Sequence, residues 1–143
     1  MSTLISALLQ VSFLTGSVSS YDQAYKMTSE TGRPLVVLVG ADWCPGCQTM
    51  KRSVIPQLES RGTLKSVAFA TVNTDQQQQL AGRLMQGGSI PQLIMFVKTD
   101  AGWQRKQMVG ARSVTEIEAF LAQNAHTPKP AAEQPSDRLA KAH

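Results

Sequence analysis

Apolar residues gather along the chain in short continuous runs that alternate with helical patterns. Residues 35–39 form an uninterrupted apolar run rich in β-branched side chains, which is typical of a strand buried on both faces of an α/β sheet. Three more strands are predicted at residues 67–72, 93–97 and 103–109. Asp100 and Gly102 supply a hairpin turn before the last of them, so we expect it to pair antiparallel with the strand before it.

Four stretches outside these strands have helical patterns: residues 20–31, residues 47–61, residues 76–85 and the stretch from residue 113 onward. Ser20 and Gln23 have the spacing of a capping box at the start of the first helix, and Ser113 and Glu116 repeat it at the last. Pro56 falls inside the second stretch and is expected to kink or restart that helix.

The order of these elements predicts the fold class. A strand, a helix and a strand in succession imply parallel pairing through a right-handed crossover, and the hairpin implies an antiparallel edge. We therefore predict an α/β fold with a central mixed β-sheet flanked by helices. Such sheets place their sites beyond the carboxyl end of a strand where the topology switches, and Cys44 follows the strand at residues 35–39.

The predicted domain covers residues 20–125, with a segment of different character on each side. In residues 1–19, the apolar stretch 4–14 and the small residues after it resemble a signal peptide. No Lys or Arg precedes that stretch, so a first strand or helix is the alternative, and exported (periplasmic) and cytoplasmic locations stay equally open. The stretch is too short to span a membrane as a helix, and no other stretch qualifies. Residues 126–143, rich in Pro and Ala, predict a disordered tail.

Composition and charge narrow the choice of partners. With 42% apolar and 17% charged residues among 143, the chain suits one soluble globular domain, which we expect to be a monomer. The net charge is +4, but the basic residues are scattered along the chain. Nucleic-acid binders gather Lys and Arg along one face with aromatic residues among them. No nucleic-acid partner is therefore predicted.

The candidate chemistry lies in two cysteines, Cys44 and Cys47. A disulfide-stapled scaffold needs more cysteines. A zinc site needs further ligands nearby, whereas His126 and His143 lie far along the chain. At a helix start, Cys44 would project beyond the helix end, where free amides and the helix dipole stabilise a thiolate. This predicts thiol–disulfide exchange, in which Cys44 attacks a disulfide and Cys47 resolves the mixed disulfide.

Several motifs in the right order resemble the thioredoxin-like superfamily over roughly residues 20–125. Residues 41–47, Ala-Asp-Trp-Cys-Pro-Gly-Cys, are similar to its active-site segment, and Ser-Ile-Pro-Gln-Leu at residues 89–93 resembles its cis-proline loop. Residues 72–75 and 109–111 also fall where the family has similar stretches. The resemblance implies a thioredoxin fold.

The same resemblance implies the roles of the site residues. Cys44 and Cys47 would be catalytic and form the redox-active disulfide, with no metal and no other cofactor. A cis Ile90–Pro91 bond would face the two cysteines. The residues expected to contact the substrate are Trp43, Pro45, Gly46, Ile90 and Pro91.

The chain also departs from the family pattern. Thioredoxins usually read Cys-Gly-Pro-Cys, whereas Pro45 and Gly46 stand in the reverse order. Leu38 stands where thioredoxins carry a buried Asp that assists proton transfer at the second cysteine, and Thr71 stands where the Lys partner of that Asp would be. Asp42 is expected to be a surface carboxylate and not a substitute. These departures imply dedicated partners in place of general thioredoxin activity.

Three interpretations follow. The leading one is a protein-disulfide oxidoreductase, a reductase before an oxidase, which acts on protein disulfides or dithiols. Because no nucleotide or flavin motif is present, its electrons would come from another protein. The second, motivated by the missing acid, is a non-enzymatic binding or scaffold module with a structural cysteine pair. The third is copper(I) handling by the two thiolates, with Met50 nearby.

Overall fold

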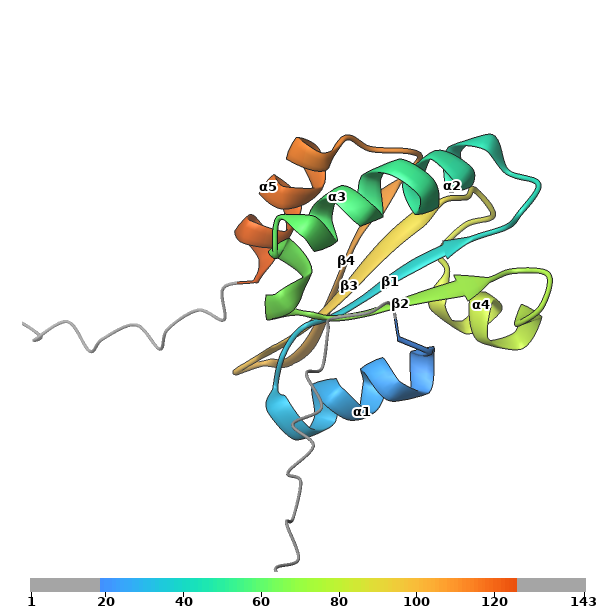
Figure 1. Cartoon of the computed structure of the whole chain (residues 1–143). Helices are drawn as coiled ribbons and strands as arrows, with labels where there is room; N and C mark the ends of the chain where they lie inside the picture. Colours follow the sequence, from blue (N-terminus) through green and yellow to red (C-terminus); the bar gives the residue numbers. More distant parts are fainter. Residues whose placement is uncertain (1–18, 126–143) are drawn as a thin grey trace, which may run out of the picture.

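The computed structural model describes residues 19–125, which form a four-stranded sheet between two layers of helices (Figure 1). Their elements are, in order, α1 (Tyr21–Thr31), β1 (Leu35–Gly40), α2 (Pro45–Thr49), the π-helical turn η1 (Met50–Val54), α3 (Ile55–Ser60), the 3-10 turn η2 (Thr63–Ser66), β2 (Ala68–Asn73), α4 (Gln78–Leu84), β3 (Gln92–Thr99), β4 (Gly102–Val109) and α5 (Val114–Asn124).

The sheet is mixed, with strand order β2-β1-β3-β4. β1 pairs parallel with β2, and the helical segment from α2 to η2 forms the crossover between them. β3 pairs antiparallel with both β1 and β4. The predicted mixed sheet, with one parallel pair and an antiparallel hairpin at the edge, is therefore confirmed.

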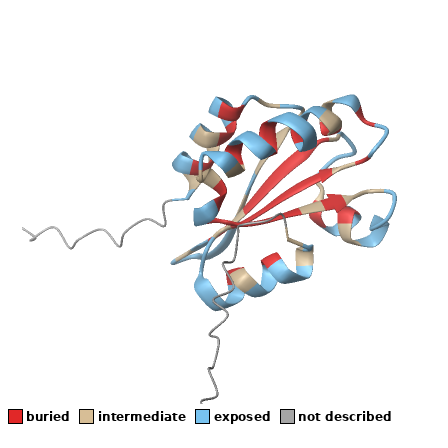
Figure 2. Cartoon of the chain, in the orientation of Figure 1, coloured by how far each residue is buried: buried red, intermediate tan, exposed pale blue. Residues whose placement is uncertain are grey.

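The central position of β1 explains its uninterrupted apolar sequence. Val36 and Leu38 belong to the apolar cluster beneath α3 and α5, while Leu35, Val37 and Val39 point into the opposite cluster with α1 and α4. Figure 2 shows this strand buried along its length between the two helix layers. Successive side chains of a strand alternate between faces, so a strand covered on both sides needs apolar residues at every position.

Both predicted capping boxes are present. The Ser20 hydroxyl accepts the Gln23 amide at the start of α1, and the Ser113 hydroxyl accepts the Glu116 amide at the start of α5, with the reciprocal bonds also made. Gly32 ends α1 in the left-handed conformation, at φ 73°, which glycine adopts without steric cost.

The helix predicted at residues 47–61 begins two residues earlier, at Pro45, and is divided into α2, η1 and α3. The Ile55 amide reaches back to the Met50 carbonyl, which is the wider spacing of a π-helix. Pro56 follows in the first turn of α3, where the missing N–H of proline is tolerated. A widened π-helical turn thus precedes Pro56, and a new helix, α3, begins at Ile55 directly before the proline. The expected restart of the helix is confirmed.

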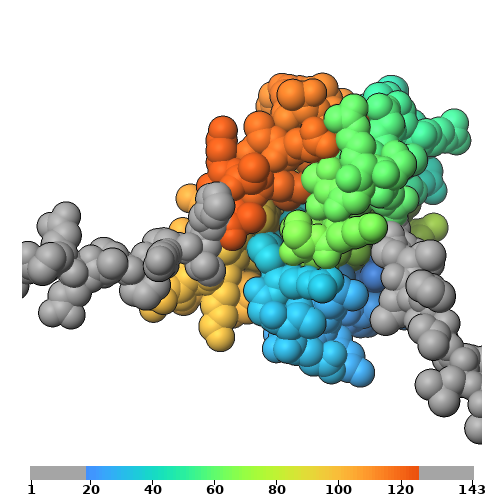
Figure 3. All heavy atoms as spheres, turned by 60° about the vertical axis from the view of Figure 1, so that its left-hand side comes forward, coloured from blue at the N-terminus to red at the C-terminus, as the bar shows by residue number. Residues whose placement is uncertain are grey.

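Helices α3 and α5 lie side by side over one face of the sheet (Figures 1 and 3). Glu118 of α5 joins them, because it accepts a hydrogen bond from the Thr63 hydroxyl at 3.0 Å and forms an ion pair with Arg61 at 3.3 Å. Their apolar faces meet in the cluster that also holds Leu58, Ile117 and Leu121.

Two predictions fall wholly or mostly outside the described residues. These are the N-terminal segment, with its alternatives of a leader or a first element, and the disordered tail at residues 126–143. Of the former, the structure describes Ser19, which forms an isolated parallel bridge with Ala70 of β2. Within residues 19–125, no helix is long and apolar enough to cross a membrane.

We predict that Ser113→Ala lowers the free energy of unfolding by about 1 kcal/mol, because the Glu116 amide loses its capping partner. Urea unfolding followed by circular dichroism measures the change. Ser29→Ala, on the exposed face of α1, is the matched control and should leave stability unchanged or slightly raised, since alanine favours a helix interior. Equal effects of the two substitutions would contradict this role of the cap.

Candidate active site

The carboxyl end of β1 and the start of α2 bring the two cysteines together. β1 ends at Gly40, and a β-carbon placed there would lie 2.8 Å from the Cys47 sulfur. A side chain at this position would therefore displace the thiol. Gly40 provides the space in which Cys47 is buried, with 1% of its surface exposed.

Cys44 is the N-terminal capping residue of α2. Its sulfur accepts the backbone N–H of Cys47 at 3.3 Å and lies 3.8 Å from the carbonyl oxygen of Ile90. Pro45 occupies the first turn, where a missing N–H leaves no hydrogen bond unmade. The free amides at the helix start favour negative charge on the capping atom, so this position suits an attacking thiolate.

Cys47 lies one turn further into the structure, and both cysteines are present as free thiols. Burial, followed by the hydrogen bond with the Cys44 side chain, raises the pKa of Cys47 to about 11. At neutral pH, Cys47 is therefore a protonated thiol. It has to lose this proton before it can act as a nucleophile.

The loop before β3 faces the cysteines, as the resemblance implied. The Ile90–Pro91 peptide bond is cis. A β-carbon at Gly46 would lie 3.4 Å from Cδ of Pro91 and 3.5 Å from Cβ of Ala111, so the α2 start packs closely against both loops. The structure thus brings Cys44, Cys47, Gly46, Ile90 and Pro91 together.

The side chain of Gln92 holds this loop in place. Gln92 is fully buried, its Oε1 accepts the Gln86 amide at 3.3 Å, and its Nε2 donates to the carbonyls of Gln86, Ser89 and Gly87 at 2.9, 3.0 and 3.3 Å. A loop this close to the core needs partners for its backbone polar groups. Gln92 supplies them immediately beside Pro91.

Trp43 lies on the surface beside Cys44, with 70% of its area exposed. Its indole N–H donates to the Asp75 carboxylate at 3.0 Å. The Asn73 side chain shapes the loop after β2 by accepting the amides of Asp75 and Gln76 at 2.8 and 3.2 Å. The indole is therefore held at the rim by a loop from the neighbouring strand, where an incoming protein could contact it.

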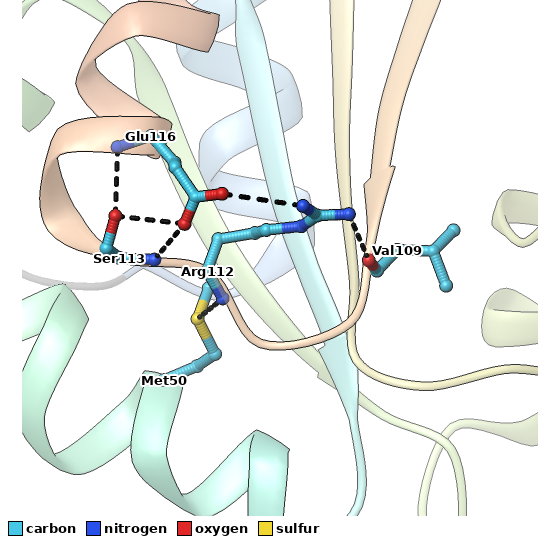
Figure 4. Close-up of polar contacts among 5 residues, drawn as sticks. All are labelled: Met50, Val109, Arg112, Ser113 and Glu116. Carbon is cyan, nitrogen blue, oxygen red and sulfur yellow. Dashed lines mark hydrogen bonds and ion pairs between the residues drawn. The ribbon is translucent and has the colours of Figure 1, made fainter.

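The segment between β4 and α5 also borders the site (Figure 4). Arg112 donates its backbone N–H to the Met50 sulfur and its guanidinium to the Val109 carbonyl, and it forms an ion pair with Glu116 at 3.5 Å. These contacts fix the segment that places Ala111 against Gly46. Met50 itself is 1% exposed and packs in the apolar core of the domain.

Sequence reasoning missed three residues that shape this site: Gly40, Gln92 and Asp75. Gln92 and Asp75 stand inside the stretches 89–93 and 72–75 that carried the resemblance, but their partners lie in loops whose path the sequence does not give. A glycine directly after a buried strand and before the cysteines was a signal for Gly40, since an interior-facing glycine often marks a close approach of another group.

We predict that Gln92→Leu lowers the free energy of unfolding by about 1–3 kcal/mol, because the polar groups of residues 86–89 lose their buried partner. It should also slow disulfide reduction, since the Ile90 carbonyl beside Cys44 is no longer held. Gln104→Leu, on the exposed edge strand β4, is the control and should do neither. Urea unfolding and a turbidimetric insulin-reduction assay are the measurements, and equal stability of both variants would refute the role of Gln92.

The raised pKa of Cys47 predicts how the stability of the reduced protein depends on pH. An unfolded chain loses this proton near pH 9, whereas the folded protein holds it until about pH 11. The stabilisation of the folded state by the protonated Cys47 thiol is therefore complete below pH 9, the pKa of this thiol in the unfolded chain. It is lost as the pH rises from about 9 to about 11. Urea unfolding across the window should show a steeper loss for the wild type than for Cys47→Ala, and parallel curves would contradict the assignment.

Comparison with known proteins agrees with the fold and the motifs. A profile of the family described as thioredoxin-like matches residues 17–98, more than half of the chain. A thioredoxin from Thermus thermophilus is 26% identical with a TM-score of 0.60, over 73% of this chain and 82% of that one. A thioredoxin from Malassezia sympodialis is 27% identical with a TM-score of 0.59, over 78% of this chain and 93% of that one.

A curated relative matches over a shorter stretch. Thiol:disulfide interchange protein DsbD of Ralstonia nicotianae is 36% identical over 53 residues, which are 37% of this chain and 9% of that protein. The present chain thus matches less than a tenth of that relative's length. The family match, the thioredoxin fold and the cysteine pair between β1 and α2 agree with one another, and the chain belongs to the thioredoxin-like family.

Proposed function

We propose that this protein reduces disulfide bonds in partner proteins and is itself reduced by another protein. The observation that carries the proposal is the position of the Cys44 sulfur, which caps α2 and lies 3.8 Å from the Ile90 carbonyl. A nucleophile beside a backbone carbonyl can attack a disulfide in a substrate strand that pairs with that carbonyl. The redox group is the Cys44–Cys47 pair, with no further cofactor.

The first step is the attack of the Cys44 thiolate on a substrate disulfide. A bond forms between the Cys44 sulfur and one substrate sulfur, the substrate disulfide breaks, and its other sulfur leaves as a thiolate. The Cys47 amide at 3.3 Å stabilises the attacking sulfur. Trp43, Pro45 and Pro91 border it and are the surfaces that a substrate would contact.

In the second step, Cys47 loses its proton and attacks the Cys44 sulfur. The internal disulfide forms, the mixed disulfide breaks, and the second substrate sulfur leaves as a thiolate that takes a proton from the solvent. The two electrons that the substrate gains come from the cysteine pair. A donor protein returns them by attacking the internal disulfide in turn.

The high pKa of Cys47 favours reduction over oxidation. Opening the internal disulfide at Cys44 expels Cys47, and a thiol with a pKa of about 11 is a poor leaving group. Because burial disfavours the Cys47 thiolate, ionisation stabilises the reduced form less, which favours the disulfide and donation of electrons by the dithiol. The name of the Ralstonia relative, a thiol:disulfide interchange protein, points to the same class of chemistry.

We predict that Cys44→Ser abolishes the reduction of insulin with dithiothreitol as the electron source, because the attacking sulfur is lost. Cys47→Ser should keep the first step and accumulate mixed disulfides, since the resolving thiol is lost. Non-reducing electrophoresis after exposure to an extract, followed by mass spectrometry of the trapped adducts, would identify the partners.

The scaffold interpretation makes the opposite prediction. If the cysteine pair is structural, Cys44 should react slowly with iodoacetamide at neutral pH, and neither substitution should change what the protein does. Activity of Cys44→Ser at the level of the wild type would overturn the proposed function.

A further inference from the structure

A small cavity reaches the buried thiol of Cys47 from the surface. Its volume is about 30 Å³, and a water molecule needs roughly 10–15 Å³ in the same measure. Among the described residues, its lining includes Cys47, Leu38 and Thr71 together with the charged residues Asp42 and Lys51.

Asp42 and Lys51 form an ion pair in this lining. The Lys51 nitrogen lies 3.7 Å from Oδ1 of Asp42, and their side chains are 50% and 67% exposed, respectively. Asp42 is thus a surface carboxylate, as the sequence predicted. Asp42 comes from the loop before Cys44 and Lys51 from η1, and both line the cavity that Cys47 also lines. The sequence also predicted that Asp42 does not replace the missing acid, but its place in the cavity lining beside Cys47 reopens that role.

The second step needs an acceptor for the proton of Cys47. With Leu38 on β1 and Thr71 on β2, neither strand supplies an acid or a base in the lining of the cavity. The titratable side chains that contact Cys47 or line its cavity are Cys44 at the N-cap of α2, Asp42 in the preceding loop and Lys51 on η1. In the mixed disulfide, the Cys44 sulfur is bonded to the substrate and cannot accept the proton. Of these groups, the Asp42 carboxylate in its ion pair with Lys51 is then the remaining candidate acceptor.

We propose that a water molecule in this cavity carries the Cys47 proton to the Asp42 carboxylate, which Lys51 holds in position. This inference rests on the proposed function and concerns its second step. The Cys47 S–H bond breaks, the proton passes through the water to Asp42 and then to the solvent, and the Cys47 sulfur forms its bond to Cys44.

The test separates the two steps with one equivalent of dithiodipyridine, an uncharged disulfide whose released thiopyridone absorbs in the ultraviolet. In stopped flow, the first release reports attack by Cys44 and the second reports attack by Cys47. The variants are Asp42→Asn, Asp42→Glu and Lys51→Met in the full chain. Lys26→Met and Glu30→Gln are the matched controls, since they remove the charges of an exposed ion pair on α1.

At neutral pH, Asp42→Asn should slow the second release by about tenfold, less than the roughly 10²–10⁴-fold of a well-placed general base because Asp42 is exposed, and leave the first unchanged. Lys51→Met should slow the same step less, and Asp42→Glu should keep most of the wild-type rate. As the pH rises, the rate of Asp42→Asn should climb toward that of the wild type, because hydroxide accepts the proton directly. The α1 controls should behave as the wild type throughout.

The proposal is overturned if the second release is unchanged in Asp42→Asn, if both releases slow equally, or if the rates stay apart at every pH. The proposed function is tested separately by the first release. Its loss in Cys44→Ser supports the exchange chemistry, and a first release that persists there would contradict that chemistry whatever Asp42 does.

Discussion

The hydrogen bond from the Cys47 amide to the Cys44 sulfur is the interaction on which the rest of the site depends. It makes the reactive sulfur the capping atom of α2, a position that Ser or Asp occupies in ordinary helices. The end of β1 fixes where α2 can begin, and the space left by Gly40 admits the second thiol beneath it. The same contact therefore caps the helix start and joins the two cysteines, while the space at Gly40 accommodates the buried thiol of Cys47.

The two cysteines have opposite requirements, and the sheet meets both. Cys44 has to reach a substrate, so it stands where β1 has ended and the loops of Trp43 and Pro91 form the rim. Cys47 has to remain protonated until the mixed disulfide exists, so it lies against the apolar end of β1. Because Leu38 stands in that lining, the low polarity that raises the pKa of Cys47 is not offset by a buried carboxylate.

The sequence was sufficient for those parts of the fold that depend on local chemistry. The apolar run of β1, the capping boxes at Ser20 and Ser113 and the proline that divides the second helix each act over a few residues, and each was found in the structure. The hydrogen-bond partners of Gln92 and Asp75 could not be predicted, because the identity of a polar residue does not indicate which distant loop its side chain will contact. Motif resemblance located the loop at Pro91, but the buried Gln92 that holds it emerged from the three-dimensional contacts alone.

The cavity beside Cys47 is lined by two of the residues at which this chain departs from the thioredoxin pattern, Leu38 and Thr71. They pair across β1 and β2, and neither supplies an acid or a cation. The same lining holds the Cys47 thiol and the Asp42–Lys51 ion pair. An exposed carboxylate is a weaker base than a buried one, because water stabilises its charge. In the proposed reaction, resolution of the mixed disulfide should then be the slow step of the cycle.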